Sequence, residues 1–525
     1  MKKYQTSIFN DVLGPVMTGP SSSHTAGPGR IGLFIGALID GTSEIAIEFP
    51  KSGSYAGTYR GQKSDVAFVA GVLGMGLTDN DFKNSLSLAD KRGVSVKIKM
   101  TGNKPKHPNE CVITVGNGDK KISVESRSTG GGMFEIRAIN GSPVVCAGDC
   151  HELIIFEKPD DARLFEYIFS DAEKNLLSQD EIAPPMNGVA NVKLKEAPQE
   201  FFLDEIKKAA RESGGDVKYI PPIIPVARRG DIELPFTSAM ELQSYIDQHP
   251  MPLWKAAVFY ESARSGWSEE KILRIAAELA EVMLRSIKSG LESDFEISGF
   301  LTPKAKMIDR YIRNGRIADA GVINDAALYS VSVMEYNNSM GIVVASPTAG
   351  SCGVVPGVLF AIAGIDKPDI TECAKALLCA GLIGVFISNG ATFAAEVCGC
   401  QAETGAAAAM ASAVASYFIG GDIETTLNGA SAALQNSLGL ICDPVAGYTD
   451  IPCISRNAAA AANAIVSANL AACGFDSVIP FDEVVGAIHD VGKMLPPELR
   501  CTGRGGLCAT ETGKRIAKSR SSEMY

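Results

Sequence analysis

Hydrophobic and polar positions alternate in the first part of the chain and follow a helical spacing in the second. Residues 44–49, 95–100, 111–115 and 121–125 alternate apolar with polar side chains, which is the pattern of half-buried strands. An apolar stretch at 31–39 follows a Gly-Pro-Gly-Arg sequence and predicts a helix before these strands. The first part of the chain is therefore expected to be an α+β domain.

The second part has the spacing of helices. Ser268 precedes two glutamates and a run of apolar residues three and four positions apart, which predicts an amphipathic helix with Ser268 as its N-cap. Later segments such as 405–415 and 458–472 consist mostly of Gly, Ala and Ser. Small side chains let helices pack closely. We expect a large all-helical domain that is rich in small residues.

These patterns predict three regions. We expect an α+β domain over residues 1–145, a small linking domain or connector over 146–231, and an all-helical domain over 232–525. Within the linking region the pattern predicts a strand at 152–156 and a helix at 160–174.

The composition restricts the binding partners and the cellular compartment that we expect for this protein. The 525 residues carry a net charge of −11 without basic stripes, which argues against a nucleic-acid partner. Thirteen cysteines without a framework, and a polar N-terminus without a signal-peptide pattern, predict reduced thiols in the cytoplasm. The apolar run 374–395 contains Lys375 and Asn389, so we expect buried helices there and no membrane span.

Three cysteines stand among turn-forming residues: Cys400 in Cys-Gln-Ala-Glu, Cys442 in Cys-Asp-Pro-Val-Ala-Gly and Cys453 in Pro-Cys-Ile-Ser-Arg-Asn. A single free cysteine is usually a small core residue, but turns of this kind let backbone bend around an inorganic ligand. Thiolates select zinc, copper(I) or iron–sulfur clusters. Close Cys-x-x-Cys pairs are lacking, which favours a cluster with one iron that no protein residue binds and that acts as a Lewis acid. Cys398 is a competing ligand.

A second candidate site lies near the N-terminus. Ser21, Ser22, Ser23 and His24 form a hydroxyl-rich loop before the first predicted helix. Such a loop can seat a carboxylate, and His24 can carry a proton. The plainer alternative is a capping loop with a solvated histidine.

Several motifs are shared, in chain order, with one enzyme family. They lie at residues 19–25 (Gly-Pro-Ser-Ser-Ser-His-Thr), 107–109 (His-Pro-Asn), 128–132 (Ser-Thr-Gly-Gly-Gly), 347–354, 400–403, 442–447, 452–457 and 499–513. The chain resembles the iron–sulfur-dependent L-serine dehydratases, or L-serine ammonia-lyases, in a form that carries both the β-type and the α-type domain on one chain.

The resemblance implies a four-iron, four-sulfur cluster held by Cys400, Cys442 and Cys453, with the substrate's hydroxyl and carboxylate on the fourth iron. It implies a β-type domain that closes over the helical cluster domain. The reaction implied is the conversion of L-serine to pyruvate and ammonia, which is a step of amino-acid degradation. We accordingly expect a cytoplasmic homodimer that acts on a small amino acid.

The same resemblance suggests roles for individual residues. His24 is the first candidate for acid–base chemistry and His107 the second. Gln62 stands where relatives carry a histidine in Gly-His-Gly-Thr-Asp, and its amide cannot shuttle a proton. The residues expected to contact the substrate are Ser21, Ser22, Ser23, Asp65, Asn109, Thr348, Arg456 and Asn457.

Other functions remain open. Gln62 is a reason to consider another β-substituted amino acid, either L-threonine or L-cysteine with loss of sulfide. A redox or electron-transfer protein would need four protein ligands, with Cys352 or Cys398 as the fourth, and a structural zinc protein is a third reading. The linking region matches no regulatory domain, so no effector is expected. Since no cysteine follows Cys508, no cysteine in a C-terminal tail is available as an iron ligand.

Overall fold

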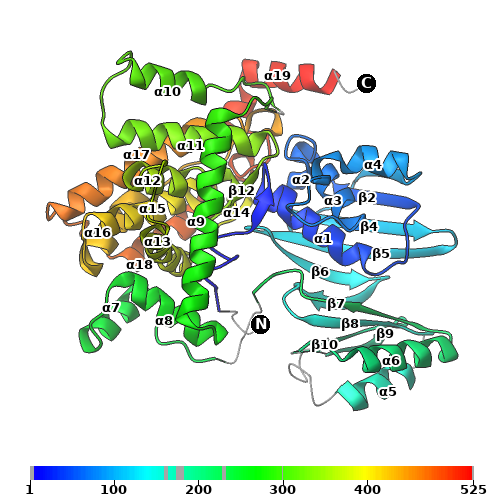
Figure 1. Cartoon of the computed structure of the whole chain (residues 1–525). Helices are drawn as coiled ribbons and strands as arrows, with labels where there is room; N and C mark the ends of the chain where they lie inside the picture. Colours follow the sequence, from blue (N-terminus) through cyan, green and yellow to red (C-terminus); the bar gives the residue numbers. More distant parts are fainter. Residues whose placement is uncertain are drawn as a thin grey trace. The chain divides into compact units, whose positions relative to one another are not determined.

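The computed structural model describes residues 5–158, 163–172, 182–194, 196–226, 232–297 and 299–522. The chain forms two compact units (Figure 1). Unit 1 comprises Met1–Ser23, Gly57–Gln62 and Arg229–Tyr525, and unit 2 comprises His24–Ala56 and Lys63–Arg228. Two N-terminal segments thus belong with the helical part of the chain, and the linking region belongs with the α+β part.

Unit 2 contains a six-stranded sheet in the order β3-β2-β4-β5-β6-β7. Only the β2–β3 pair is parallel, because the chain returns between these two strands through helices; the other pairs are antiparallel. All four predicted strands are confirmed. The strands are β2 (Glu44–Pro50), β3 (Ser95–Thr101), β4 (Glu110–Asn117), β5 (Lys120–Gly130), β6 (Met133–Ile139) and β7 (Ser142–Cys146).

Four helices accompany this sheet: α1 (Gly27–Gly36), α2 (Ser54–Thr58), α3 (Ser64–Val72) and α4 (Ser85–Lys91). The helix predicted at 31–39 is α1, which begins and ends earlier than its apolar run. Helix α1 packs against α3 at a glycine contact. A Cβ atom on Gly71 would overlap the backbone of Gly29 and Leu33, so only glycine allows this close approach.

The linking region forms a second sheet, in the order β11-β8-β10-β9, in which every pair is antiparallel. The strand predicted at 152–156 is confirmed as β8, and the helix predicted at 160–174 contains α5; residues 159–162 and 173–181 lie outside the described part. The succession of elements is βαββαβ. They are β8 (His151–Phe156), α5 (Arg163–Ala172), β9 (Ile182–Met186), β10 (Val189–Leu194), α6 (Glu200–Ser213) and β11 (Asp216–Ile220).

The two helices of this small layer cover one face of its sheet with an apolar core. Leu153 and Ile155 of β8 are buried against Ile168 of α5 and Ile206 of α6. A layer of this kind is a folded element with its own core, which an extended connector would lack. Independent folding of residues 1–145 or 146–231 stays a prediction.

Unit 1 is largely helical, as predicted, and it also contains a short antiparallel pair of strands, β1 (Val16–Thr18) and β12 (Ile342–Val344). Ser268 caps its longest helix, α9, by accepting a hydrogen bond from the N–H of Lys271 at 3.3 Å. The helices are α7 (Ala239–Gln248), α8 (Leu253–Ser265), α9 (Glu269–Glu292), α10 (Ala305–Arg313), α11 (Val322–Asn338), α12 (Val354–Ala363), α13 (Ile370–Gly390), α14 (Ala395–Cys398), α15 (Thr404–Phe418), α16 (Ile423–Gln435), α17 (Cys453–Ala472), α18 (Phe481–Met494) and α19 (Glu511–Ser522).

Helix α15 lies at the centre of unit 1, where α12, α13, α16 and α17 all pack against it. Every residue from Thr404 to Ser416 is buried, and most of these residues are alanine. Because alanine and glycine keep helix axes close, four neighbours can surround one helix. The prediction that small residues mark tight helix packing is confirmed here.

Helix α13 is long and apolar enough to cross a membrane by length and composition alone. In the structure 78% of its most apolar window is buried, and α8, α9 and α15 pack against it. A core helix of a globular unit has these properties.

We expect Gly71→Ala to destabilise unit 2 by about 2 kcal/mol, because the added methyl group forces α1 and α3 apart in a packed core. The exposed Gly76, around which a Cβ atom would meet nothing within 4 Å, gives the matched control Gly76→Ala. Urea unfolding of both variants checks the prediction. Equal stability of the two variants would contradict the glycine contact.

Candidate active site

The three predicted ligands lie where helices of unit 1 begin or end. Cys400 opens the short 3-10 helix η6 (Cys400–Ala402), Cys442 lies just before η7 (Val445–Gly447), and Cys453 is the first residue of α17. All three are buried. The Sγ atoms of Cys400 and Cys442 and a carboxylate oxygen of Glu403 lie within 4.8 Å of one another. Thiol groups from two distant segments are therefore gathered at one point.

Cys453 lies within electrostatic reach of this group. Burial raises the pKa of Cys453 well above its usual range, and charges on Cys400 and Glu403 raise it further. A metal cation bound by all three thiolates would stabilise their negative charges in this buried position.

Gly399 sets the turn that presents Cys400. Its φ of 73° is left-handed, and a Cβ atom there would lie 2.7 Å from the carbonyl oxygen of Leu440. Glycine is the residue that adopts this conformation without strain and leaves that space open. The glycine before Cys400 thus has a steric reason.

A fourth thiol, Cys501, joins the group, and the sequence analysis did not identify it. Cys400, Cys442 and Cys501 pack together in one buried cluster. The C-terminal segment pairs with the loop before η7: Cys442 N–H donates to Leu499 O at 2.9 Å, and Cys501 N–H donates to Cys442 O at 2.8 Å. One sequence signal for Cys501 was its position within the shared motif at residues 499–513. Thr502 and Gly503, which follow it, are turn-forming residues like those around the other three cysteines.

Arg456 binds the thiol group directly. Its Nη1 donates to Cys400 Sγ at 3.5 Å and to Ile441 O at 2.8 Å, and its Nη2 donates to Asp443 Oδ1 at 2.9 Å. Asp443 in turn accepts a hydrogen bond from the N–H of Leu507 at 2.8 Å. The guanidinium therefore holds the thiol of Cys400 in place, whereas the sequence analysis expected it to seat the substrate's carboxylate; a role in substrate binding stays a prediction.

The hydrogen bond between Cys400 and Cys442 shifts the pKa values of the two thiols in opposite directions. It lowers the pKa of Cys400, and the positive charge of Arg456 lowers that pKa further. The same bond raises the pKa of Cys442 well above its usual range. The first thiolate therefore forms at Cys400, beside the cation.

Glu403 is a further group that the sequence analysis did not name. Thr348, which was predicted to bind substrate, donates its hydroxyl hydrogen to Glu403 Oε1 at 2.8 Å. Loss of contact with water raises the pKa of Glu403 well above its usual range, and the nearby Cys400 adds to this effect. Thr348 thus fixes a carboxyl group next to the thiols.

Asn457 connects the motif at 347–354 to α17. Its Oδ1 accepts from Gly353 N–H at 3.1 Å, and its Nδ2 donates to Gly350 O at 2.8 Å and to Cys453 O at 2.9 Å. These bonds hold the start of α17, and with it Cys453, in position. Contact between Asn457 and substrate stays a prediction.

The serine-rich segment is a helical turn rather than the expected loop. Ser22 begins the π-helical turn η1 (Ser22–Ala26), which leads directly into α1. Ser21 and Ser22 are buried and Ser23 is half-buried. The Nδ2 of Asn337 donates to the carbonyl oxygen of Pro20 at 2.9 Å and fixes the entry to this turn.

Gln62 belongs to unit 1 and lies beside the fourth thiol. Its Nε2 is 3.9 Å from Cys501 Sγ. Gln62 is thus in contact with one thiol of the group, and a catalytic role for it stays a prediction.

His24 lies in unit 2 and is fully buried, so the solvated histidine considered as an alternative is wrong. A distance of 3.1 Å separates its Nε2 from Ser54 Oγ, and the ring of Tyr55 meets it edge to face at 4.9 Å. Burial lowers the pKa of His24 to about 3. The imidazole is therefore neutral at physiological pH.

His107, Asn109 and Asp65 also lie in unit 2. The Nδ1 of His107 accepts from Asn109 N–H at 3.2 Å, which leaves the proton of the neutral ring on Nε2. Burial lowers the pKa of His107 to about 4. Asp65 lies in the first turn of α3 and accepts from Val66 N–H at 2.9 Å.

Two further cysteines that were considered as ligands lie apart from the thiol group. Cys352 Sγ contacts Met334 Sδ at 3.8 Å, and burial raises its pKa. Cys398 Sγ contacts His489 Nδ1 at 3.8 Å and packs against Gly492. The fourth ligand of a closed site would accordingly be Cys501.

Residues 203–508 match the family model for the serine dehydratase alpha chain, over more than half of the protein. The chain belongs to this family. It is therefore an enzyme, of the ammonia-lyase type.

Named relatives agree with the family. The "Probable L-serine dehydratase, alpha chain" of Bacillus subtilis (strain 168) is 39% identical over 251 residues, covering 48% of this chain and 84% of that protein. The "L-serine dehydratase, alpha chain" of Peptoniphilus asaccharolyticus is 36% identical over 282 residues, or 54% of this chain and 97% of that protein. "L-serine dehydratase 1" of Escherichia coli (strain K12) is 26% identical over 511 residues, or 93% of this chain and 96% of that protein.

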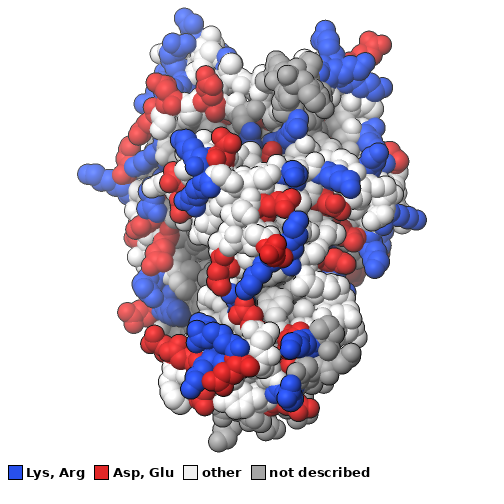
Figure 2. All heavy atoms as spheres, turned by 90° about the vertical axis from the view of Figure 1, so that its right-hand side faces the viewer, with Lys and Arg blue, Asp and Glu red and all other residues white. Residues whose placement is uncertain are grey.

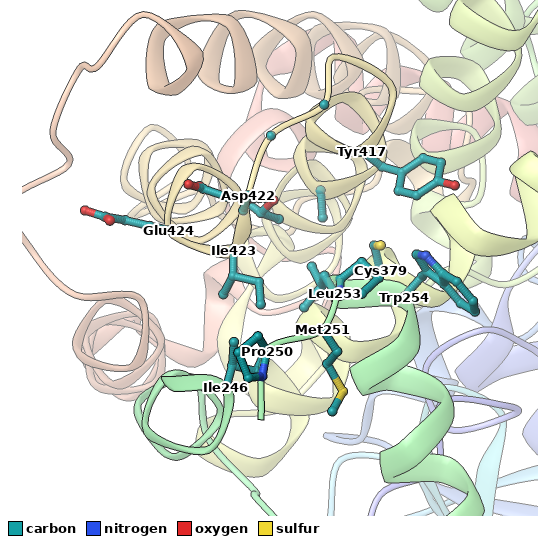
Figure 3. Close-up of a pocket in the computed structure, with 15 residues that line it drawn as sticks. Ile246, Pro250, Met251, Leu253, Trp254, Cys379, Tyr417, Asp422, Ile423 and Glu424 are labelled. Carbon is teal, nitrogen blue, oxygen red and sulfur yellow. Dashed lines mark hydrogen bonds between the residues drawn. The ribbon is translucent and has the colours of Figure 1, made fainter. Parts of the chain in front are cut away.

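Unit 1 of this serine dehydratase family member also has an apolar cavity of about 490 Å³, distinct from the thiol group (Figure 3). Trp254 of α8, Tyr417 of α15 and Ile423 of α16 line it. None of the residues predicted to bind substrate or metal lines this cavity. It therefore takes no part in the site described above.

Because burial lowers the pKa of His24 from 6.5 to about 3, the unfolded chain binds this proton more readily between those values. The associated stability is complete above pH 6.5 and is lost as the pH falls. Between pH 7.5 and 5.5 the loss amounts to about 1.4 kcal/mol. We expect His24→Asn to reduce the pH dependence of the free energy of unfolding by that amount, while the exposed His249→Asn leaves it unchanged. Identical slopes in wild type and His24→Asn would contradict the burial of a neutral ring.

Proposed function

We propose that the chain is an iron–sulfur-dependent L-serine dehydratase that converts L-serine to pyruvate and ammonia. The observation that carries this proposal is the buried group of Cys400, Cys442 and Cys453, with the guanidinium of Arg456 on Cys400. Family membership and the names of the relatives support the reaction.

The donor set fits a four-iron, four-sulfur cluster. Thiolates favour soft metals and clusters over the oxygen-seeking cations, and Glu403 is the one oxygen donor in the compact group with Cys400 and Cys442 among the described residues. Cys400, Cys442 and Cys453 would hold the cluster. When bound, it supplies a Lewis-acidic iron that assists departure of the substrate's hydroxyl group.

Side chains of the protein would compensate charge and transfer protons. Arg456 offsets the negative charge of the thiolates, and Ser21, Ser22 and Ser23 would donate hydrogen bonds to the substrate's carboxylate. His24, whose imidazole is neutral at the working pH, is the first candidate to take the α-proton. His107 is the second candidate for this step. The enamine that elimination leaves is hydrolysed by water to pyruvate and ammonia.

Gln62 bears on the choice of substrate. An amide can orient a substrate through hydrogen bonds but cannot move a proton, so elimination from L-threonine or L-cysteine is the alternative on the same scaffold. Activity toward the three amino acids, compared at equal cluster content, decides between them. We further propose a homodimer located in the cytoplasm.

The distribution of charged side chains on the surface indicates which class of partner the protein can bind. On the face drawn in Figure 2, lysine and arginine side chains are interspersed with aspartate and glutamate side chains. A continuous basic stripe, which a nucleic-acid backbone requires, is not seen among the described residues of this face. A small amino acid is the partner that we propose.

We expect anaerobically reconstituted wild type to contain four irons per chain and to release pyruvate from L-serine. Cys442→Ser removes a ligand and should lose the cluster's visible absorption and at least about 100-fold of the activity. Cys379→Ser, a buried thiol of α13, is the matched control and should retain both.

Three outcomes of this experiment carry different meanings. A cluster without pyruvate from L-serine would contradict the substrate assignment. Absence of iron in the wild type would contradict the cluster itself. Equal loss in both cysteine variants would indicate damage to the fold rather than to the site.

A second candidate function, a redox protein or a zinc protein with a closed site, is favoured by one observation: Cys501 provides a fourth thiol in the buried group. Four protein ligands would leave no position for substrate. We expect instead that Cys501→Ser retains four irons per chain and responds spectrally to L-serine. Cys508→Ser, whose thiol donates to Pro444 O at 3.0 Å, is the control in the same segment. Loss of the cluster in Cys501→Ser alone would favour the closed site.

A further inference from the structure

Two adjacent asparagines lie at the C-terminal end of helix α11 (Figure 1), and both are buried. Asn337 is fully buried and Asn338 is 1% exposed. The amide of an asparagine often binds backbone groups a few positions away in the chain. At the end of α11 the two amides also bind the backbone of segments that are far away in the sequence. The end of this helix is therefore a junction between distant parts of unit 1.

Asn337 joins two segments that carry residues expected to contact the substrate. Its Nδ2 donates to Pro20 O at 2.9 Å and to Ala349 O at 3.1 Å. Pro20 directly precedes Ser21–Ser23, and Ala349 directly follows Thr348. An amide nitrogen has two hydrogens to donate. Both are thus used, and one planar group sets the separation of the two segments.

The serine-rich segment rests directly on Asn337. The pairing of β1 with β12 extends one residue further, because Gly19 N–H donates to Gly341 O at 3.0 Å. A Cβ atom on Gly19 would lie 2.1 Å from Asn337 O and 2.2 Å from Asn337 Oδ1. Glycine is the residue that allows the backbone to approach so closely. The entry to the serine-rich segment is therefore held against Asn337 at two successive residues.

The two halves of the Asn337 amide are used differently. Its Oδ1 is buried and finds no hydrogen-bond partner among the described residues. An unpaired buried acceptor is unfavourable for stability. Exceptions of this kind occur where a side chain serves function. The contribution of this amide is therefore the pair of hydrogen bonds that it donates.

Asn338 makes the corresponding connection to the loop between two of the expected cluster ligands. Its Nδ2 donates to Thr449 O at 3.1 Å, and its Oδ1 accepts a hydrogen bond from the hydroxyl group of Thr449. Thr449 lies between Cys442 and Cys453 in the chain. Because Asn337 and Asn338 are neighbours on one helix, they hold the serine-rich segment and the ligand loop at a fixed relative position.

We propose that Asn337 is a positioning residue for the substrate, which holds Ser21–Ser23 in place relative to the ligand loop that Asn338 holds. The proposal rests on the proposed function, in which these serines bind the substrate's carboxylate. Asn337 acts through the serines and does not touch the substrate. Loss of its two hydrogen bonds should therefore weaken the binding of L-serine and leave the cluster in place, whereas loss of Asn338 should weaken the cluster.

The first test compares Asn337→Ala with Asn338→Ala and with the control Asn324→Ala after anaerobic reconstitution. Asn324 lies on the same helix, and its side chain donates to Ala318 O at 2.9 Å, outside the junction. Asn337→Ala should keep four irons per chain and raise the KM for L-serine at least about 10-fold, with a smaller change in kcat. Asn338→Ala should lose iron to a chelator at least about 10-fold faster, with an unchanged KM. Asn324→Ala should match the wild type.

Two outcomes of this comparison would overturn the proposal. The first is an unchanged KM in Asn337→Ala. The second is a loss of iron from Asn337→Ala as fast as that from Asn338→Ala, which would indicate a purely structural role for both residues.

A second variant disturbs the same contact and leaves Asn337 itself unchanged. Gly19→Ala inserts a methyl group against the oxygens of Asn337 and should also raise the KM. Gly486→Ala in α18, where a Cβ atom would meet nothing within 4 Å, is the matched control and should not. Because Gly19→Ala and Asn337→Ala displace the same segment, the double variant should show less than the product of the two separate increases. Independent, multiplying effects would contradict the proposal.

Hydrogen exchange of the backbone amides, measured by mass spectrometry without L-serine, separates this proposal from the proposed reaction. Asn337→Ala should speed exchange at residues 19–23 at least about 10-fold, and Asn338→Ala should do so at residues 445–452 instead. Unchanged exchange at residues 19–23 in Asn337→Ala would overturn the positioning role even if the wild type converts L-serine. The expected exchange pattern in a wild type that binds no L-serine would contradict the proposed reaction and confirm that Asn337 holds the segment.

Discussion

The hydrogen bonds of Arg456 unite the parts of the site. One guanidinium reaches the thiol of Cys400, the carbonyl of Ile441 and the carboxylate of Asp443, and Asp443 binds the backbone of the C-terminal segment at Leu507. Three stretches of chain separated by tens of residues thereby meet at one cation. A buried positive charge is costly alone, but beside thiolates and a carboxylate it is compensated.

The sequence predicted the features that depend on local pattern. Alternating side chains marked the strands of unit 2, Ser268 marked the start of α9, and small residues marked the tight packing around α15. Turn residues around Cys400, Cys442 and Cys453 marked the candidate ligands. These signals work because strand alternation, capping and turn geometry are set by residues a few positions apart.

The sequence analysis did not predict the features that depend on contacts between residues far apart in the chain. Cys501 joins the thiol group only because the C-terminal segment pairs with the backbone of Cys442, and Glu403 becomes part of the site through Thr348. His24 was predicted as a proton carrier, with a solvated histidine as the alternative, but its burial beside Ser54 and Tyr55 was not predicted. Of the βαββαβ layer in the linking region only the first strand and the first helix were predicted, since strand pairing across its helices has no local signature.

The central claim is that the protein leaves one iron of the cluster to the substrate. Mössbauer spectroscopy of the ⁵⁷Fe-reconstituted enzyme, with and without L-serine, tests it most directly. The account predicts that one iron of the four changes its isomer shift and quadrupole splitting when L-serine binds, while the other three stay as they are. Four irons that keep the same parameters at saturating L-serine would contradict it.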